Sequence, residues 1–246
     1  MTKPVTAYII WYGNWPASHP ALTIVPEFLS NIGNSAWWNI STTYYDNSAV
    51  GGAKVSPTVA FVQSTTVGYT KGTNPSNAGI QSVVTTAISS GALPGDVNGV
   101  YFVLSSADVN QNSGFCTNYC GWHTNTNMAG VGYIKYSWVG NPARCPANCA
   151  AQTTSPNGDT GTDGMISIMA HELTEAATDP LLNAWYDGNG YENADKCAWK
   201  FGTTSTASNG AQYNLVLSSP TGVNSQRQYM VQQNWVNAAT GYCAMQ

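Results

Sequence analysis

Six cysteines constrain the fold of this chain more than any other feature of its sequence. An even number of cysteines in a chain with few charged residues is typical of a disulfide framework formed in an oxidising compartment. Two pairs have the spacing CxxxC, and the other two cysteines are left to close a long loop. Pairing by proximity along the chain predicts three disulfides, Cys116–Cys120, Cys145–Cys149 and Cys197–Cys243. The alternative for the two CxxxC pairs is a structural zinc site.

The composition favours an extracellular protein. Charged side chains make up 8% of the 246 residues, against about 25% in a typical soluble domain, so uncharged polar residues must cover the surface. The net charge of -4 and the scattered Lys and Arg residues argue against a nucleic-acid partner. No apolar run is long enough for a membrane span. Residues 1–4 lead directly into a predicted strand, and we expect a mature secreted form with an added start methionine.

Strand-like and helix-like apolar patterns alternate in the first part of the chain, which predicts an α/β fold with a mixed, twisted sheet. No linker divides the chain, so we expect a single domain over residues 1–246. The expected strands span residues 6–12, 58–62, 99–104, 131–139, 212–217 and 228–232. The expected helices span residues 20–32, 77–90 and 165–178. We expect the last helix to follow Asp163 as its N-cap and to line a cleft.

The acidic residues are concentrated in one stretch. Eight of the twelve Asp and Glu residues lie between positions 159 and 195, where no Lys or Arg occurs. Carboxylates gathered without basic partners repel one another and are costly to desolvate. A bound cation would relieve this repulsion, whereas the alternative is a solvated acidic face. The carboxylates alternate with apolar helix residues, and this pattern favours the cation.

Within this stretch, residues 171–175 form the motif HExxE. His171 and Glu175 lie one helical turn apart and can bind one ion, as the two histidines of HExxH do in zinc peptidases. Glu172 takes the place of the general base of those enzymes, and we predict it as the catalytic residue. A carboxylate replaces the second histidine, which zinc accepts and which also admits calcium or manganese. We therefore expect a zincin-like helix that holds a divalent metal, with zinc preferred and calcium as the alternative.

Three residues are candidates for a third metal ligand. Glu192 and Asp195 follow Glu175 by 17 and 20 residues, an arrangement that resembles thermolysin-like enzymes. His123 is the other candidate, because a disulfide beside it would hold its loop rigid. The remaining histidine, His19, is expected to be a surface or hydrogen-bonded residue rather than a ligand.

Distinctive segments run along nearly the whole chain. They are Ile10-Trp11-Tyr12-Gly13, residues 103–109, Phe115-Cys116, Cys120-Gly121-Trp122-His123, Trp138-Val139-Gly140-Asn141, residues 145–149, 156–159 and 163–165, Ala170-His171-Glu172-Leu173 with Glu175, and Asn183-Ala184-Trp185-Tyr186. With these segments the sequence resembles the EXORDIUM / phosphate-induced protein 1 family. The resemblance implies a secreted, cell-wall or extracellular protein linked in plants to growth control, and it supports His123 as part of the site. The long plant-type tail after the helix is replaced here by the shorter loop from Asp187 to Asp195, so the resemblance supports ligands in this loop less than it supports His123.

Two classes of function follow from these features. The first is a metal-dependent hydrolase, a zincin-like metallopeptidase, in which the metal polarises a carbonyl and Glu172 takes a proton from water. Its substrate would be a peptide or a cell-wall glycan. The second is a non-enzymatic extracellular protein with a structural metal, either structural, carbohydrate-binding, growth-signalling or self-assembling. Nine Trp and fourteen Tyr residues suit carbohydrate stacking, although aromatic side chains more often fill a core.

Overall fold

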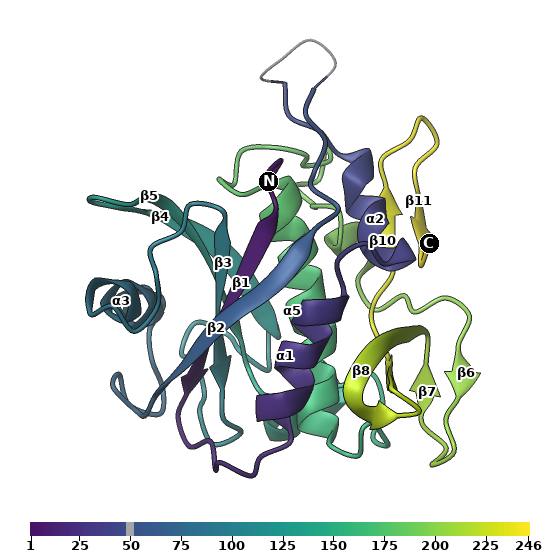
Figure 1. Ribbon diagram of the computed structural model, residues 1–246, viewed down its shortest axis with the longest axis horizontal. Helices are drawn as coiled ribbons and strands as arrows, with labels where there is room; N and C mark the ends of the chain where they lie inside the picture. Colours follow the sequence, from purple (N-terminus) through teal and green to yellow (C-terminus); the bar gives the residue numbers. More distant parts are fainter. Residues whose placement is uncertain (48–51) are drawn as a thin grey trace.

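A computed structural model describes residues 1–47 and 52–246 and shows a mixed α/β fold. Its centre is a five-stranded sheet with the order β2-β1-β3-β5-β4. The strands are β1 (Val5–Tyr12), β2 (Val59–Val67), β3 (Gly99–Ser105), β4 (Gly121–Met128) and β5 (Gly132–Val139). β1, β2, β3 and β5 are parallel, and β4 runs antiparallel to β5 at one edge. The expected mixed sheet is therefore confirmed, with β3 at its centre (Figure 1).

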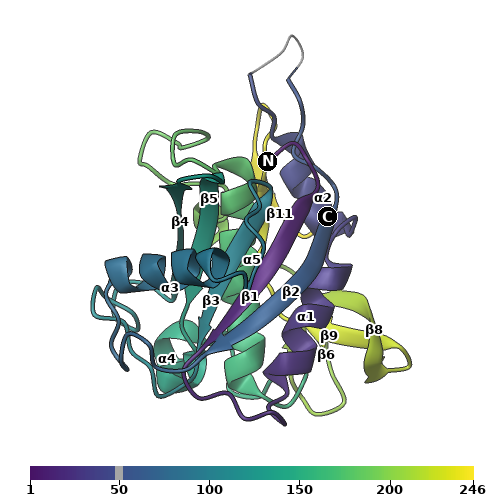
Figure 2. The ribbon, with the colours of Figure 1, turned by 60° about the vertical axis from the view of Figure 1, so that its left-hand side comes forward.

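Three long helices cover the two faces of this sheet. They are α1 (Ala21–Asn31), α3 (Asn77–Ser89) and α5 (Thr160–Thr178). Helix α3 packs on one face, and α1 and α5 pack on the other (Figures 1 and 2). Because helices lie on both faces, every residue of the central strand β3 is buried, which explains its continuous apolar sequence. No helix in the described ranges is long and apolar enough to cross a membrane.

Helix α5 begins earlier than its sequence predicts. The N-cap is Asp159, whose Oδ1 atom accepts a hydrogen bond from the Thr162 backbone N–H at 2.7 Å. Asp163, the predicted N-cap, is instead a buried residue inside the first turns and accepts two hydrogen bonds from Asn157. The first turn of the helix contains Thr and Gly and no apolar repeat. The apolar pattern therefore begins about one turn after the helix does, and the sequence predicts too late a start. Almost the whole helix is buried, because the sheet, α1 and the short segments at residues 40–43 and 142–149 pack against it.

The structure has three disulfides, but two of the predicted pairings are wrong. The bonds are Cys116–Cys145, Cys120–Cys149 and Cys197–Cys243. The first two each span 29 residues and together tie the loop before β4 to α4 (Pro146–Cys149). The loop and the short helix lie side by side, so each cysteine meets its counterpart on the other segment rather than its neighbour in sequence. Only the prediction of Cys197–Cys243 is confirmed, and no cysteine is left free for zinc.

The chain beyond α5 forms three two-stranded ribbons. They pair β6 (Ser205–Thr206) with β7 (Gln212–Tyr213), β8 (Leu215–Val223) with β9 (Gln226–Tyr229), and β10 (Asn234–Val236) with β11 (Tyr242–Ala244). The β8–β9 ribbon is anchored on α1, where Tyr229 packs against Phe28 and Arg227 pairs with Glu27 at 3.2 Å. The expected strand at 212–217 is interrupted at Asn214, whose side-chain oxygen accepts a hydrogen bond from the Val231 backbone.

Short helices complete the described structure. They are α2 (Ala36–Asn39), η1 (Ile40–Thr43), η2 (Pro142–Arg144) and η3 (Asp195–Cys197), the last three of 3₁₀ type. Strand β4 has no counterpart among the expected elements, because its sequence GWHTNTNM contains no apolar run. It lies at the edge of the sheet, and its residues are half-buried or exposed. A strand in this position does not need a continuous apolar sequence.

Candidate metal centre

Helix α5 supplies the first half of the candidate site. One helical turn separates His171 from Glu175, and the His171 Nε2 atom lies 3.1 Å from the Glu175 Oε1 atom. Asp195, at the start of η3, brings its Oδ1 atom to 3.5 Å from the same imidazole nitrogen. The pairing on α5 that the HExxE motif predicts is therefore present, and a carboxylate from a distant loop joins it.

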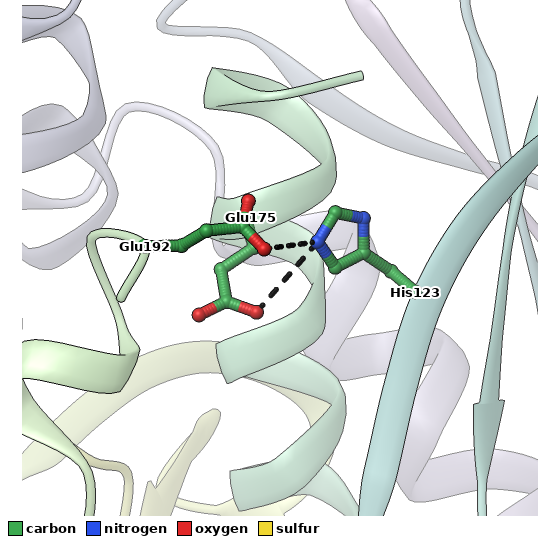
Figure 3. Close-up of side chains that lie close together, drawn as sticks. All are labelled: His123, Glu175 and Glu192. Atoms are coloured by element: carbon green, nitrogen blue, oxygen red, sulfur yellow. Dashed lines mark hydrogen bonds and ion pairs between the residues drawn. The ribbon is translucent and has the colours of Figure 1, made fainter. Parts of the chain in front are cut away.

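Strand β4 supplies the second half. His123 lies opposite Ser137 of β5, in a register that directs its side chain toward α5. Its Nε2 atom lies 3.0 Å from the Glu192 Oε2 atom and 3.8 Å from the Glu175 Oε2 atom. Figure 3 shows this arrangement, with the imidazole facing the two carboxylates from the strand side. His123 and Glu192 thus enter the same cluster as the α5 residues.

Glu175 joins the two halves, because one of its oxygens faces His171 and the other faces His123. Glu175 therefore belongs to two groups of candidate ligands, one with His123 and Glu192 and one with His171 and Asp195. Within each group the ligand atoms lie within 4.8 Å of one another. The loop residues are held in place by their backbone. The Asp195 N–H donates to Glu175 Oε1 at 3.1 Å, and the Glu192 N–H donates to Asp195 Oδ2 at 3.3 Å. The five predicted ligands therefore form two groups of three that share Glu175.

Burial and charge shape the protonation of this cluster in the absence of a metal. The side chains of His123 and Glu175 are each 4% exposed. Burial opposes the charged form of His123, but the hydrogen bond to Glu192 and the charge of Glu175 outweigh it and raise its pKa to about 9. Burial likewise opposes the charged form of His171, yet Glu175 and Asp195 raise its pKa well above the ordinary value. Each imidazole therefore takes a proton to balance the carboxylates.

The residues fit a divalent cation. With neutral imidazoles the cluster carries three carboxylates, and no Lys or Arg side chain forms an ion pair with them among the described residues. The buried His171 Nδ1 and Glu192 Oε1 atoms have no hydrogen-bond partner within the described chain. Four ligand atoms around an ion at about 2.1 Å would be separated by roughly 3.4 Å. In the group around His123 the separations are 3.0 and 3.8 Å, and in the group around His171 they are 3.1 and 3.5 Å, so both groups lie around this value.

Glu172 lies beside the cluster rather than in it. Burial raises the pKa of its carboxyl group to about 8, with Glu175 acting in the same direction and the two histidines opposing it. The side chain packs against Gly121 of β4, where a Cβ atom would lie 2.9 Å from the Glu172 Oε1 atom. The glycine thus makes room for the carboxyl group. Sequence reasoning did not assign Gly121 a role, although it lies in the Cys-Gly-x-His element.

A pocket of about 510 Å³ opens onto one side of the cluster. His171, Glu172 and Asp195 lie in its wall, and the disulfide Cys120–Cys149 lies in the wall as well. His123, Glu175 and Glu192 are not part of this wall. The arrangement therefore has a buried side that could hold an ion and an open side that could admit a ligand.

The other acidic residues of the stretch have structural roles. Asp179 is the C-cap residue of α5 and accepts hydrogen bonds from the Asn183 and Ala184 backbones. Asp187 accepts hydrogen bonds in the turn that follows. His19 lies elsewhere, next to Trp15, and its Nδ1 atom accepts a hydrogen bond from the Ala21 N–H. The prediction that His19 is a surface or hydrogen-bonded residue agrees with this contact.

Comparison with known proteins identifies the family. The family model described as phosphate-induced protein 1 conserved region matches residues 1–246. EXORDIUM-like 3 of Arabidopsis thaliana is 34% identical, and the match covers 99% of this chain and 80% of that protein. EXORDIUM-like 5 of the same plant is 35% identical over 76% of this chain, and PHOSPHATE-INDUCED 1 of Nicotiana tabacum is 28% identical over 75%.

The chain spans 57% of the length of EXORDIUM-like 5 and 64% of that of PHOSPHATE-INDUCED 1. No solved structure matches it. The family model matches the whole length of the chain, and this confirms the family resemblance that the sequence segments indicate. The chain therefore belongs to the phosphate-induced protein 1 family.

Proposed function

We propose that this chain is an extracellular protein that holds one divalent metal ion among His123, His171, Glu175, Glu192 and Asp195. The observation that carries the proposal is the position of Glu175, whose two carboxylate oxygens face two imidazoles from different elements at 3.1 and 3.8 Å. A strand, a helix and a loop bring two histidines and three acidic residues close together, and a metal ion would use them as ligands. As an ion-pair network they would only be costly to bury.

Zinc suits this donor set better than calcium does. Imidazole nitrogen together with carboxylate oxygen is an ordinary zinc environment. Calcium prefers six to eight oxygen ligands, and two of the five side chains here offer nitrogen. We therefore propose zinc as the ion, with calcium as the weaker alternative.

A structural role for the metal is the leading proposal. The relatives' names describe no enzymatic activity, and the three disulfides suit an extracellular location. An ion shared by β4, α5 and the loop at residues 192–195 would fasten three separate segments to one another. Because ion binding occurs only in the folded chain, its free energy adds to the stability of the fold.

One observation favours a second candidate, a metal-dependent hydrolase that acts on a peptide or glycan. The pocket exposes His171 and Glu172 together, so a ligand there would meet both. A bound zinc ion supplies a Lewis acid and lowers the pKa of water in its neighbourhood. Glu172 could take a proton from water at its carboxylate, since its pKa of about 8 lies close to neutral pH. Its burial against Gly121 would hold it in place.

A pair of matched substitutions on α5 tests the metal. Glu175→Gln and Glu172→Gln each replace a carboxylate by an amide of the same size, at positions three residues apart on the helix. After removal of metal with EDTA and reloading with zinc, elemental analysis should find about one zinc per wild-type chain. Glu175→Gln should bind zinc at least 10-fold more weakly, because it loses a shared ligand, whereas Glu172→Gln should bind it normally. Full zinc occupancy in Glu175→Gln would show that the site is wrong.

The same proteins separate the two candidate functions. Zinc-loaded wild type and Glu172→Gln are incubated with a broad peptide library and with cell-wall oligosaccharides, and products are detected by mass spectrometry. Turnover by the wild type that falls about 10²–10⁴-fold in Glu172→Gln supports the hydrolase. A zinc-loaded wild type that cleaves none of these substrates supports the structural role.

A further inference from the structure

A second pocket lies apart from the metal centre, where β1 and β3 end. Its volume is about 340 Å³, and it shares no lining residue with the pocket over His171. Polar and aromatic side chains dominate its wall, namely Asn14, Trp15, His19, Ser106, Asp108 and Asn141. The proposed metal function uses none of them.

The topology of the sheet creates this pocket. From β1 the chain passes through α1 to β2 on one side, and from β2 it passes through α3 to β3 on the other side of β1. The segment that leaves β1 leads to α1 on one face of the sheet, whereas the segment that leaves β3 places Val109 in the core on the α3 face, and Figure 2 shows α1 and α3 on these two faces. A crevice opens between two parallel strands whose connections diverge in this way, and open α/β sheets bind their ligands there.

The turn after β1 is built to fit the turn after β3. Gly13 has a φ of +99°, and a Cβ atom there would lie 2.1 Å from the Ser106 Oγ atom. That oxygen accepts a hydrogen bond from the Asn14 N–H at 2.9 Å and donates one to Asp108 Oδ1 at 2.6 Å. The Tyr69 hydroxyl donates to the other Asp108 oxygen. The carboxylate of Asp108 is thus fixed at the mouth of the crevice.

Two hydrogen-bond donors in the pocket wall remain free. Asn141 is 3% exposed, and its Oδ1 atom accepts from the Ala143 N–H at 2.9 Å, while its Nδ2 group has no partner in the described ranges. His19 accepts at Nδ1 from the Ala21 N–H at 3.2 Å, so the neutral ring carries its proton on Nε2. That nitrogen also has no partner among the described residues. The buried amide and the imidazole thus offer N–H groups to a ligand.

The sequence points to the same place. Three segments that carry the family resemblance, residues 10–13, 103–109 and 138–141, end at this crevice, since β1, β3 and β5 deliver them to one edge of the sheet. None of the three contributes a ligand to the metal cluster. A structural requirement accounts for their buried strand residues, but it does not account for free polar groups at their carboxyl ends.

We propose that this crevice binds a neutral carbohydrate, one or two sugar residues in size. A sugar hydroxyl both donates and accepts, and it can therefore bridge the Asp108 carboxylate to the N–H groups of Asn141 and His19. The carboxylate disfavours phosphate and other anions in the same space. Trp15, against which His19 lies at a ring-centroid distance of 4.9 Å, offers an apolar edge for the carbon side of a sugar ring. The volume is at the small end of ligand pockets.

Two substitutions remove one donor each and keep the contact that orders the side chain. Asn141→Asp keeps an oxygen for the Ala143 N–H, and His19→Asn keeps an acceptor for the Ala21 N–H. Asn127→Asp, exposed near the far end of β4, is the matched control. Glu175→Gln is the control for the metal centre. Binding is measured by calorimetry with cellobiose, mannobiose, galactobiose and xylobiose, and with digalacturonate as an anionic comparator.

We expect saturable binding of at least one neutral disaccharide, weakened about 10-fold or more by Asn141→Asp and by His19→Asn. Both controls should keep the wild-type Kd. In the wild type, whose only histidines are at 19, 123 and 171, the sugar should shift the imidazole NMR signals of His19 alone, a result that does not depend on how the variants fold. Binding of no neutral disaccharide, preference for digalacturonate, or an unmoved His19 signal would each overturn the proposal.

Discussion

Raising the pH should destabilise the metal-free protein, and His123 accounts for a large part of the effect. In an unfolded chain the histidine pKa is about 6.5, whereas in the fold Glu192 and Glu175 raise it to about 9. Between these values the folded state holds one proton more than the unfolded state. The free energy of unfolding therefore falls by about 1.4 kcal/mol for each pH unit. The contribution of His123 is complete below pH 6.5 and is lost as the pH passes 9, which amounts to about 3 kcal/mol.

The neighbouring groups act in the same direction, because the pKa values of His171 and Glu172 are also raised in the fold. The buried N-terminal amine of Met1, whose pKa is lowered to about 6, acts in the opposite direction below pH 8, and the comparison with His123→Gln cancels its effect. For a chain of this size about 3 kcal/mol corresponds to a fall of roughly 6–12 °C in the thermal midpoint. The assay is thermal unfolding in EDTA from pH 6.5 to 9, with His123→Gln as the comparison. His123→Gln should lose about 3 kcal/mol of the pH dependence, because glutamine can donate a hydrogen bond to Glu192 but does not titrate.

Zinc should reverse the trend, since it binds only the neutral imidazoles and its affinity rises with pH. With zinc present the midpoint should therefore hold or rise from pH 6.5 to 8. The reasoning fails if the metal-free protein is equally stable across this range or becomes more stable with rising pH. It also fails if His123→Gln shows the same pH dependence as the wild type.

Three further outcomes are expected. Replacing Cys120 and Cys149 together by Ala leaves Cys116–Cys145 in place, so the lost bond closes only a short loop through residues 116–120 and 145–149. The loss should lower the free energy of unfolding in a denaturant titration by about 2–3 kcal/mol through the regained loop entropy; an unchanged midpoint would contradict this. Gly121→Ala places a Cβ atom 2.9 Å from the Glu172 carboxyl and should cost about 1–3 kcal/mol in the same titration, with zinc content retained. Gly13→Ala, at a φ of +99°, should cost about 1–3 kcal/mol by thermal unfolding, and a neutral effect would show that the turn can relax.

The α5 half of the candidate metal site was predictable from sequence because it depends on local geometry. A helix fixes the spacing of His171 and Glu175 whatever the rest of the chain does. Glu192 and Asp195 could be named only as alternatives, since a loop of this length can return to the helix in many ways. His123 was a candidate because a cysteine lies three residues before it, and the family resemblance supported it. Its placement depends on β4, and the polar sequence of that edge strand gives no periodic signal.

The disulfides show where proximity in sequence fails. Cys116 and Cys120 are near neighbours along the chain, yet the loop that holds them runs beside the segment of Cys145 and Cys149. Pairing across two adjacent segments is a tertiary property, and no local rule reports it. Cys197 was assigned correctly because its partner was fixed by elimination. The start of α5 was misplaced for a related reason, since its first turn is buried by tertiary contacts and not by an amphipathic pattern.

The loop that carries Glu192 and Asp195 is restrained at both ends before any ion binds. At one end Asp179 caps α5 and accepts hydrogen bonds from the first residues of the loop. At the other end Cys197, fully buried, follows Asp195 by two residues and is bonded to Cys243. An ion that binds here therefore orders little additional chain, and less of its binding energy is spent on lost conformational entropy. The disulfide Cys197–Cys243 would thus contribute to the affinity for the proposed ion by fixing the loop that supplies two of the candidate ligands.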